Sequence, residues 1–274
     1  GVDPRVTPIE EVPVTVEAAD DFGLEGLELH YAVNGGAEQV IPLLKAKGTR
    51  EADGKTLLSL ETFKMVPGDV IALYASAKDA KTTTRSDILF AEAQPFDFKF
   101  TQSQQAGGGG GGMGNQEGQI SERQKQIIAA TWNEIRSGSA KSRTALQEDA
   151  QFLSDTQGKL SEQAKTLAER MNSRELDGAS KEFENFGKLM TDASTQMNNA
   201  VGQLKPGKWR DALPPEQKAL QSLLRAEALF RNIQVAFGQQ GGGGGGGGGA
   251  QRDLARMFDL ELDTTKNQYE TGQQ

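Results

Sequence analysis

The chain contains no cysteine and a single histidine, His30. Without thiols it cannot form disulfides, cysteine nucleophiles or cysteine-ligated zinc and iron–sulfur sites. One histidine also excludes histidine-rich metal sites and leaves one candidate imidazole base. His30 alternates with the apolar Leu29 and Tyr31 and shares its strand face with Glu28. Since no nucleophile motif accompanies it, we expect His30 to be solvent-exposed and not catalytic, and we expect no enzyme activity and no cofactor.

Long apolar runs are also missing. No stretch approaches the roughly 20 apolar residues that span a bilayer, and no basic segment followed by an apolar one opens the chain. The chain begins at Gly1 without an initiator methionine. We therefore expect an excerpt or a processed product, in which any membrane anchor lies in segments outside this chain.

Basic side chains are outnumbered by acidic ones, 30 to 38, which gives a formal net charge of -8. The excess lies in residues 1–104, which hold 17 acidic and 10 basic side chains, against 21 and 20 in the remainder. An acidic surface repels phosphate backbones and anionic lipid headgroups. We therefore expect no nucleic-acid partner and no direct binding to a membrane surface.

Glycine, by contrast, is abundant, and many of the 33 glycines lie in homopolymeric runs at 107–112 and 241–249. The runs match a dinucleotide-binding pattern trivially, but no Gly-Lys-Ser or Gly-Lys-Thr follows them, so we interpret them as flexible linkers. We divide the chain into a β domain (1–104), a glycine-rich linker (105–117), a helical bundle (118–238), a poly-glycine linker (239–250) and a short C-terminal helix and tail (251–274). Because the first linker carries no apolar contacts, we expect the two modules to fold separately.

Apolar and polar residues alternate in short segments of the first module, and turn residues separate these segments. The expected strands are 12–18, 27–33, 39–44, 56–63, 70–77, 87–91 and 96–101. The expected turns are Asp20-Asp21-Phe22-Gly23, Asn34-Gly35-Gly36, Ala52-Asp53-Gly54 and Pro67-Gly68-Asp69. Seven short strands in about a hundred residues predict an immunoglobulin-like antiparallel β-sandwich, here without the disulfide of antibody domains.

From residue 116 the apolar residues recur at helical spacing. The expected helices are 120–135, 146–171, 183–204 and 214–237, followed by a short helix at 252–262. Two heptad stripes stand out: Leu146, Ala150, Leu153, Gln157, Leu160, Ala164, Leu167 and Met171, and then Phe183, Phe186, Met190, Ala193, Met197, Ala200 and Leu204. Pro206 and Gly207 should end the third helix, and Pro214 and Pro215 should open the fourth. Matching stripes joined by a short turn predict an antiparallel bundle with a coiled-coil hairpin, and we favour packing within one chain and hence a monomer. The alternative is that the same stripes pair between chains, since narrow heptad seams also make dimers.

Two groups of residues are candidate sites. The carboxylates of Asp20, Asp21 and Asp79 could together hold calcium, although capping of turns explains such residues more often. Trp132 and Trp209 could form a ligand platform, but an aromatic residue at helical spacing more often packs in a core.

Three segments resemble a known family: DALPPEQKALQSLLRAEA (211–228), FDLELDTTKNQYE (258–270) and DDFGL (20–24). Together they are similar to large bacterial proteins that carry domain of unknown function 4175, and the resemblance covers nearly the whole chain. It implies transmembrane helices upstream, an extracytoplasmic β domain, helical segments and long tails rich in glutamine and glycine. The family has no established catalytic residues to transfer to this sequence.

We therefore expect a non-catalytic structural or protein-interaction segment of a bacterial cell-envelope protein, in the periplasm or on the cell surface. The sequence does not identify the protein partner. The alternative is a ligand-binding module that recognises a glycan or a peptide through the sandwich loops. An exposed row of aromatic side chains on one sheet would support the glycan form of that alternative.

Overall fold

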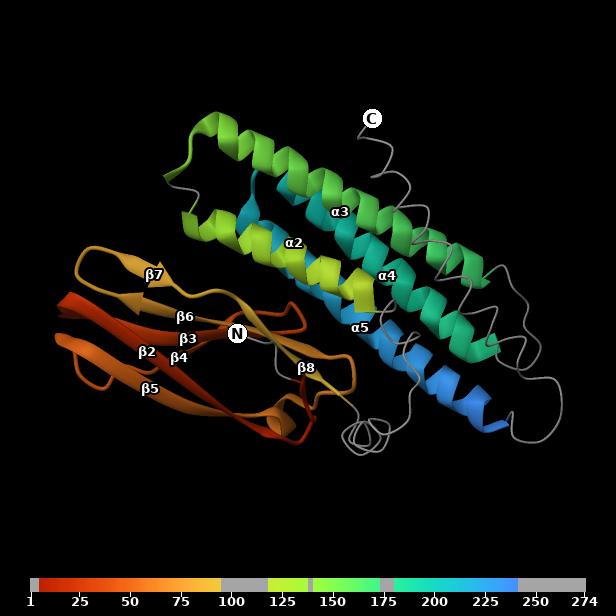
Figure 1. The fold of residues 1–274 in the computed structure, drawn as a ribbon, viewed down its shortest axis with the longest axis horizontal. Coiled ribbons are helices and arrows are strands. Elements are labelled where there is room, and N and C mark those ends of the chain that lie inside the picture. Colours follow the sequence, from red (N-terminus) through yellow and green to blue (C-terminus); the bar gives the residue numbers. More distant parts are fainter. Residues whose placement is uncertain (1–4, 95–117, 138–139, 173–179, 241–274) are drawn as a thin grey trace, which may run out of the picture.

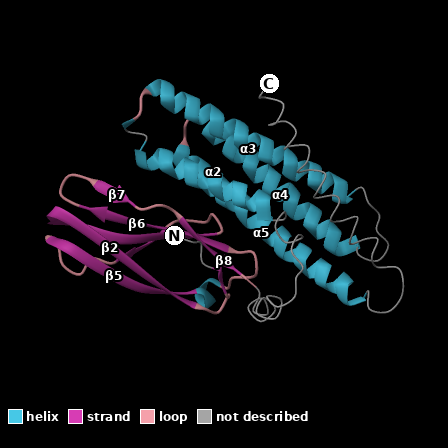
Figure 2. Cartoon of the chain, in the orientation of Figure 1, coloured by secondary structure: helices cyan, strands magenta, loops and turns pink. Residues whose placement is uncertain are grey.

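The computed structural model describes residues 5–94, 118–137, 140–172 and 180–240. In these residues, eight strands form two sheets, and four helices lie along one of the sheets (Figures 1 and 2). The strands are β1 (Arg5–Val6), β2 (Glu11–Leu24), β3 (Gly26–Val33), β4 (Gln39–Pro42), β5 (Thr49–Ser59), β6 (Val70–Lys78), β7 (Thr83–Arg85) and β8 (Leu89–Ala93). The helices are α2 (Gly118–Ser137), α3 (Arg143–Asn172), α4 (Ser180–Leu204) and α5 (Trp209–Gln240), with a short 3-10 helix, η1 (Leu60–Phe63), after β5.

The larger sheet has the strand order β1-β8-β6-β3-β4, and the short β7 also pairs with β6. All its pairs are antiparallel except β1 with β8. The smaller sheet consists of the antiparallel pair β2 and β5. The two sheets share one hydrophobic core, to which the larger contributes Leu27, Leu29, Ile71 and Leu73 and the smaller Val12, Val14, Val16 and Leu58. The predicted antiparallel β fold is therefore confirmed.

Strand β5 begins earlier than predicted, because the expected turn Ala52-Asp53-Gly54 lies inside it. A Cβ atom on Gly54 would stand only 2.5 Å from the Cβ atom of Leu43. Glycine at this position therefore admits a neighbouring side chain and does not end the strand. At its other end β5 stops at Ser59, and the predicted extension of the strand forms η1 instead.

Strand β2 continues through the expected turn at 20–23 and ends at Leu24. Its pairing with β5 is irregular between Ala19 and Leu24, and Gly23 has a φ of 99°. The acidic residues thus mark a distortion of the strand and not its end. The predicted strand 96–101 and helix 252–262 and both glycine runs lie outside the described residues.

Between β7 and β8 the register against β6 shifts by one residue. The Ser86 hydroxyl accepts the Ala75 N–H at 2.9 Å, and the Ser86 N–H donates to the Ala75 carbonyl oxygen at 2.9 Å. These contacts satisfy the backbone at the interruption, as at a β-bulge.

The helices confirm most of the predicted boundaries and stripes. The stripe residues of α3 and α4 are buried wherever they are described, apart from the half-buried Leu146. Gly207, after the end of α4, has the left-handed φ of 71° that a helix-ending glycine adopts. The predicted start of the fourth helix at Pro214 is wrong, since α5 begins at Trp209 and contains Pro214 and Pro215. The fixed φ of proline is itself helical, so the prolines do not interrupt the helix close to its start.

The helices pack around their own core, which includes Leu160 and Leu167 of α3, Phe186, Met190 and Met197 of α4, and Leu223 and Phe230 of α5. Polar pairs are buried in the same bundle. The side-chain amides of Gln124 and Gln157 hydrogen bond to each other at 3.1 and 2.8 Å, and the hydroxyl oxygens of Ser161 and Ser194 lie 2.9 Å apart. Within the described residues, no helix combines the length and apolarity that a bilayer span needs.

The bundle covers the face of the larger sheet that points away from β2 and β5 (Figure 1). Side chains of β6 and β8 meet α2 and α5 there in a second apolar cluster, which comprises Val70, Ala72, Tyr74, Ile88, Phe90, Ile128, Trp132, Leu220 and Leu224. We expected the two modules to fold separately because the glycine tract at 107–112 has no apolar residue to carry contacts across the boundary. The contacts run instead through β6, which is apolar on both faces, the pattern of a strand covered on both sides. The domain boundaries themselves stay a prediction.

Two turns of the sheet also contact α5. The Asp69 carboxylate, which is buried, accepts hydrogen bonds from two Arg225 nitrogens at 2.7 and 2.9 Å. A Cβ atom on Gly68 would stand 2.6 Å from the Arg225 Cα, and one on Gly35 would stand 2.6 Å from the Pro214 carbonyl oxygen. Both glycines have positive φ values. They therefore serve a second purpose besides turning the chain, which is to let the helix backbone approach.

Candidate functional site

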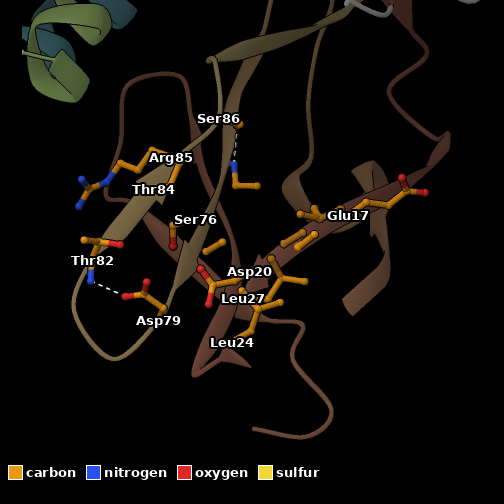
Figure 3. A pocket seen from close by; sticks show the side chains of 15 residues that line it. Glu17, Asp20, Leu24, Leu27, Ser76, Asp79, Thr82, Thr84, Arg85 and Ser86 are labelled. Atoms are coloured by element: carbon orange, nitrogen blue, oxygen red, sulfur yellow. Dashed lines mark hydrogen bonds between the residues drawn. The ribbon is translucent and has the colours of Figure 1, made fainter. Parts of the chain in front are cut away.

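A pocket of about 300 Å³ opens at one end of the two sheets (Figure 3). Its walls come from β2, β3 and β6 and from the segment that contains β7. The apolar part of the wall is formed by Val16, Ala18, Leu24, Leu27, Ala75 and Ala77. Glu17, Asp20, Asp79 and Arg85 add charged groups around it. The pocket thus has an apolar interior, and most of the charged residues that line it are acidic.

The two strands beside this pocket have unpaired edges. In the part of the chain that the structure describes, β2 pairs only with β5, and β7 pairs only with β6. In antiparallel pairs, every second residue directs its N–H and C=O away from its partner strand. The pocket therefore lies between strand edges that present free backbone donors and acceptors.

The acidic residues at the pocket cap turns of the backbone. The Asp79 carboxylate accepts the N–H groups of Thr82 and Lys81, the latter at 2.6 Å, and these two contacts, in this order, lower the pKa of Asp79. The Asp20 carboxylate accepts the N–H of Phe22 at 2.9 Å. The capping interpretation of these residues is therefore confirmed.

The calcium hypothesis receives no support from this geometry. Asp20 and Asp79 line the same pocket, whereas Asp21 does not. The described residues contain no group of three or more histidine or acidic side chains that could hold a metal ion. Calcium binding at Asp20, Asp21 and Asp79 stays a prediction without a formed ligand set.

Phe22 adds an exposed aromatic ring close to the pocket. It follows the pocket residue Asp20 by two positions, its side chain is 81% exposed, and the Lys81 ammonium lies 5.4 Å from its ring centroid. The other aromatic among the exposed large apolar residues of the described chain is Phe152, 68% exposed on α3. The two rings lie on different modules, so the described residues offer no aromatic row of the kind that would favour a glycan site.

The prediction of an exposed His30 is wrong. Its side chain is only 13% exposed. Alternation places it correctly on the face opposite Leu29, but that face continues into the area that the bundle covers. The His30 ring stacks on Tyr74 with 4.6 Å between ring centroids and 5° between planes. The sequence pattern identified the face but not the helices beside it.

His30 connects the pocket to a polar network. Its Nε2 lies 3.0 Å from the Ser76 Oγ, and its Nδ1 lies 3.1 Å from Glu38 Oε1. The Tyr74 hydroxyl donates to Glu38 Oε2 at 2.9 Å, and burial, followed by this bond, raises the pKa of Tyr74 well above its usual value. Glu38 and Ser76 were not identified from the sequence, because the pairing of β3 with β6 that brings Ser76 beside His30 was not known.

Ser76, His30 and Glu38 stand in the order of a serine–histidine–acid relay. Three features distinguish this arrangement from that of a catalytic serine. Ser76 is only 6% exposed, and its hydroxyl also donates to Glu28 at 3.4 Å. It lies inside β6, between β3 and β7, where the sheet uses neighbouring backbone N–H groups that an oxyanion hole would need. We interpret the relay as a structural network that holds the pocket wall.

The network reaches the bundle through Trp132. The Trp132 ring packs against Tyr74 with 4.2 Å between centroids, and its Nε1–H donates to the Ser86 carbonyl oxygen at 2.9 Å. The core prediction is therefore confirmed for Trp132, which is buried. Trp209 is half-buried; it packs on a small cluster with Leu153 and Leu204 and lines another pocket of about 400 Å³ at the end of the bundle.

Comparison of the chain with protein-family models, curated proteins and solved structures gave no match. The site is therefore interpreted from its own geometry.

Proposed function

We propose that this chain is a non-catalytic protein-interaction segment of a bacterial cell-envelope protein, with the pocket of Figure 3 as its contact site. The observation that carries the proposal is the position of the pocket between two unpaired strand edges. An apolar pocket with free backbone groups on its border can accept a partner segment without any rearrangement of the core.

The finer fold assignment belongs to the same proposal. The strand order β1-β8-β6-β3-β4, opposite a second sheet of β2 and β5, supports an immunoglobulin-like sandwich. The shared core of α3 and α4 supports an antiparallel coiled-coil hairpin. The resemblance of 20–24, 211–228 and 258–270 to proteins with domain of unknown function 4175 supports an extracytoplasmic location, with membrane anchorage by segments outside this chain.

In this proposal the bundle is a rigid support and spacer for the sandwich. Asp69 and Arg225 form an ion pair at 2.7 Å, and Arg136 of α2 pairs with Asp87 at the bulge. Trp132 holds the Ser86 carbonyl, and Ser86 itself lines the pocket. These contacts fix the pocket wall to the helices, so a force on one module is transmitted to the other.

The alternative is a ligand-binding module. The pocket supports this alternative for a peptide ligand but not for a glycan. The walls include Asp79 and Thr82 from the turn between β6 and β7, as expected of a site built on sandwich loops. The single exposed ring of Phe22 does not provide the stacking surface that a glycan requires. A free peptide and a segment of a protein partner would make the same contacts with this pocket and differ only in the size of the bound molecule.

Photo-crosslinking in the native host tests the proposal. A benzophenone side chain in place of Phe22, next to the pocket, should give a discrete protein adduct. The same side chain in place of Phe152 on α3 is the matched control, since both residues are exposed phenylalanines. Adducts from Phe152 alone, or from neither position, would contradict the assignment of the contact site to the pocket.

A further inference from the structure

We propose that the pocket between β2 and β7 binds an extended peptide segment of a protein partner, in which apolar side chains alternate with lysine or arginine. This inference rests on the proposed function and adds the chemistry of the partner. Three observations carry it: the strand edges, the dimensions of the pocket and its charge.

The edge of β2 can pair with an added strand. β2 has 14 residues and uses one side to pair with β5, and no strand of the described residues occupies the other side. Pro13, near its start, lacks an N–H and is tolerated where no ladder bond is needed. Next to the pocket, at Glu17 and Ala19, the backbone has no such interruption. A peptide can therefore add to β2 by main-chain hydrogen bonds, which is a common mode of recognition of extended segments.

The pocket fits alternate side chains of such a strand. Successive residues of a strand point to opposite faces, so every second side chain would enter the space between the sheets. Ala18 on β2 and Ala75 and Ala77 on β6 line that space, and their small side chains leave it open. Its volume of about 300 Å³ is at the lower limit of small-molecule sites, ~300 Å³. A few aliphatic side chains fill it, whereas a large compact ligand does not.

The charge of the pocket selects the remaining side chains. Asp20 and Asp79 contribute two carboxylates and Arg85 one guanidinium. The carboxylate of Glu17 lies on the exposed outer face of β2 and points away from Asp20 and Asp79 in Figure 3. Asp20 and Asp79 both line the pocket (Figure 3), and backbone N–H groups hold both carboxylates in place. A lysine or arginine on the added strand meets this acidic border, while an acidic strand is repelled.

The same charge argues against a second copy of this chain as the occupant. Two β2 edges would bring Glu11, Glu17 and Asp21 of one copy towards the same residues of the other, and like charges on paired strands are destabilising. The partner is therefore a different, basic segment.

Fluorescence anisotropy with labelled synthetic peptides tests the inference on the full chain. The probe is a short peptide of alternating valine and lysine. Its comparators are a peptide of alternating valine and glutamate and an N-methylated valine–lysine peptide that cannot donate main-chain hydrogen bonds. We expect the first to bind, and both comparators to bind at least about tenfold more weakly, which corresponds to one lost charge or hydrogen-bond contact of ~1.4 kcal/mol.

Charge reversal locates the binding. Glu17→Lys should weaken binding of the valine–lysine peptide about tenfold, because it reverses the carboxylate on the outer face of the β2 edge, beside which the outward lysines of an added strand would lie. Glu11→Lys is the matched control, since Glu11 is an exposed glutamate on the same strand that does not line the pocket, and it should leave the affinity within about twofold once salt screening is applied. Circular dichroism of both variants checks that they are folded.

The outcomes separate the two proposals. Equal binding of the acidic or N-methylated peptide, with sensitivity to Glu17→Lys, would overturn strand addition of a basic segment but leave the pocket as a contact site. The inference would be overturned if no peptide binds, or if Glu11→Lys and Glu17→Lys reduce the affinity for the peptide equally. The proposed function would still be tested separately by crosslinking at Phe22. A protein mass that doubles without peptide, together with no binding of the valine–lysine peptide, would replace the basic partner by a second copy.

Discussion

The open end of the sandwich and the interior of the helical bundle differ in how they use polar groups. In the bundle, polar side chains such as Gln124 and Gln157 are buried and bond to each other. At the end of the sandwich, an apolar pocket remains open, and no other described strand pairs with the free edges of β2 and β7. In the described residues, these polar groups of the bundle thus find partners inside it, whereas the end of the sandwich keeps an open pocket. This difference is the basis for proposing a structural role for the bundle and a recognition role for the end of the sandwich.

The largest expected effect is on the stability of the bundle core. Leu160 of α3 is buried in the core that α3 shares with α4 and α5. Leu160→Ala leaves a cavity there and should lower the free energy of unfolding by about 2 to 4 kcal/mol. Glu162→Ala, at an exposed position of the same helix, should change it by about 0.5 kcal/mol or less. Denaturant titration measures both, and equal effects would contradict the seam that the stripes predict.

Glu227 of α5 gives the next effect, through pH. Burial raises the pKa of Glu227 to about 7, while the Ser121 hydroxyl lowers it and the nearby Glu92 raises it further; Arg231 and Lys125 lower it slightly. The folded state therefore holds a proton that the unfolded chain loses near pH ~4.3. Stability from this group is complete below that pH and is lost as the pH rises through about 7, by up to ~3 kcal/mol.

Glu227→Gln should flatten this part of the pH dependence. The measurement is the difference in unfolding free energy between the wild-type chain and Glu227→Gln across the same pH range. The buried Glu216, whose pKa burial also raises, contributes equally to both proteins and cancels in the difference. A wild-type curve that parallels the variant would show that Glu227 does not titrate in this interval.

A matched pair of glycines tests the contact between the two regions. Gly68 and Gly48 both have positive φ, at 88° and 80°, but a Cβ atom at Gly68 would overlap the Arg225 backbone, whereas one at Gly48 meets nothing within 4 Å. Alanine should cost about 1 kcal/mol at either site for its conformation, and about 2 kcal/mol more at position 68 for the overlap. Thermal unfolding compares them. Equal losses of stability in the two alanine variants would show that the turn at Gly68 does not pack closely against α5.

The smallest expected effect is at the Ser76, His30 and Glu38 network. Because Ser76 is buried and lacks an oxyanion hole, a fluorophosphonate probe should not label the chain, and Ser76→Ala should not change hydrolysis of a test ester. Labelling of wild-type protein that Ser76→Ala removes would make the relay catalytic. That result would also mean that the pocket is a catalytic site and not a contact site for a partner.

The sequence predicted the bundle better than the sandwich. Heptad stripes are a repeated signal, and single features such as Pro206 and Gly207 mark helix ends. Strands gave weaker signals: Gly54 looked like a turn but admits Leu43, and the three residues of β7 are too few for alternation to be visible. Register, which determines the partners of His30, depends on the pairing of distant segments and cannot be read from one strand.

The site was the least predictable part. Of the proposed calcium residues, Asp20 and Asp79 line the pocket, but as turn caps. The pocket itself depends on which strand edges stay unpaired, and that follows from topology and not from local pattern. One signal was available: β6 reads Val-Ile-Ala-Leu-Tyr-Ala, apolar on both faces, and indicates a sheet covered on both sides.

The most direct test of the contrast between the two regions is a chemical-shift map of the full, isotope-labelled chain on addition of the valine–lysine peptide. The account predicts that amide shifts concentrate at Glu17, Ala19 and Thr84 on the strands that border the pocket, with a smaller shift of the Trp132 indole, which bonds to the pocket residue Ser86. The core of α3 and α4 should stay unchanged. Shifts that follow the bundle instead, with none along β2 and β7, would contradict it.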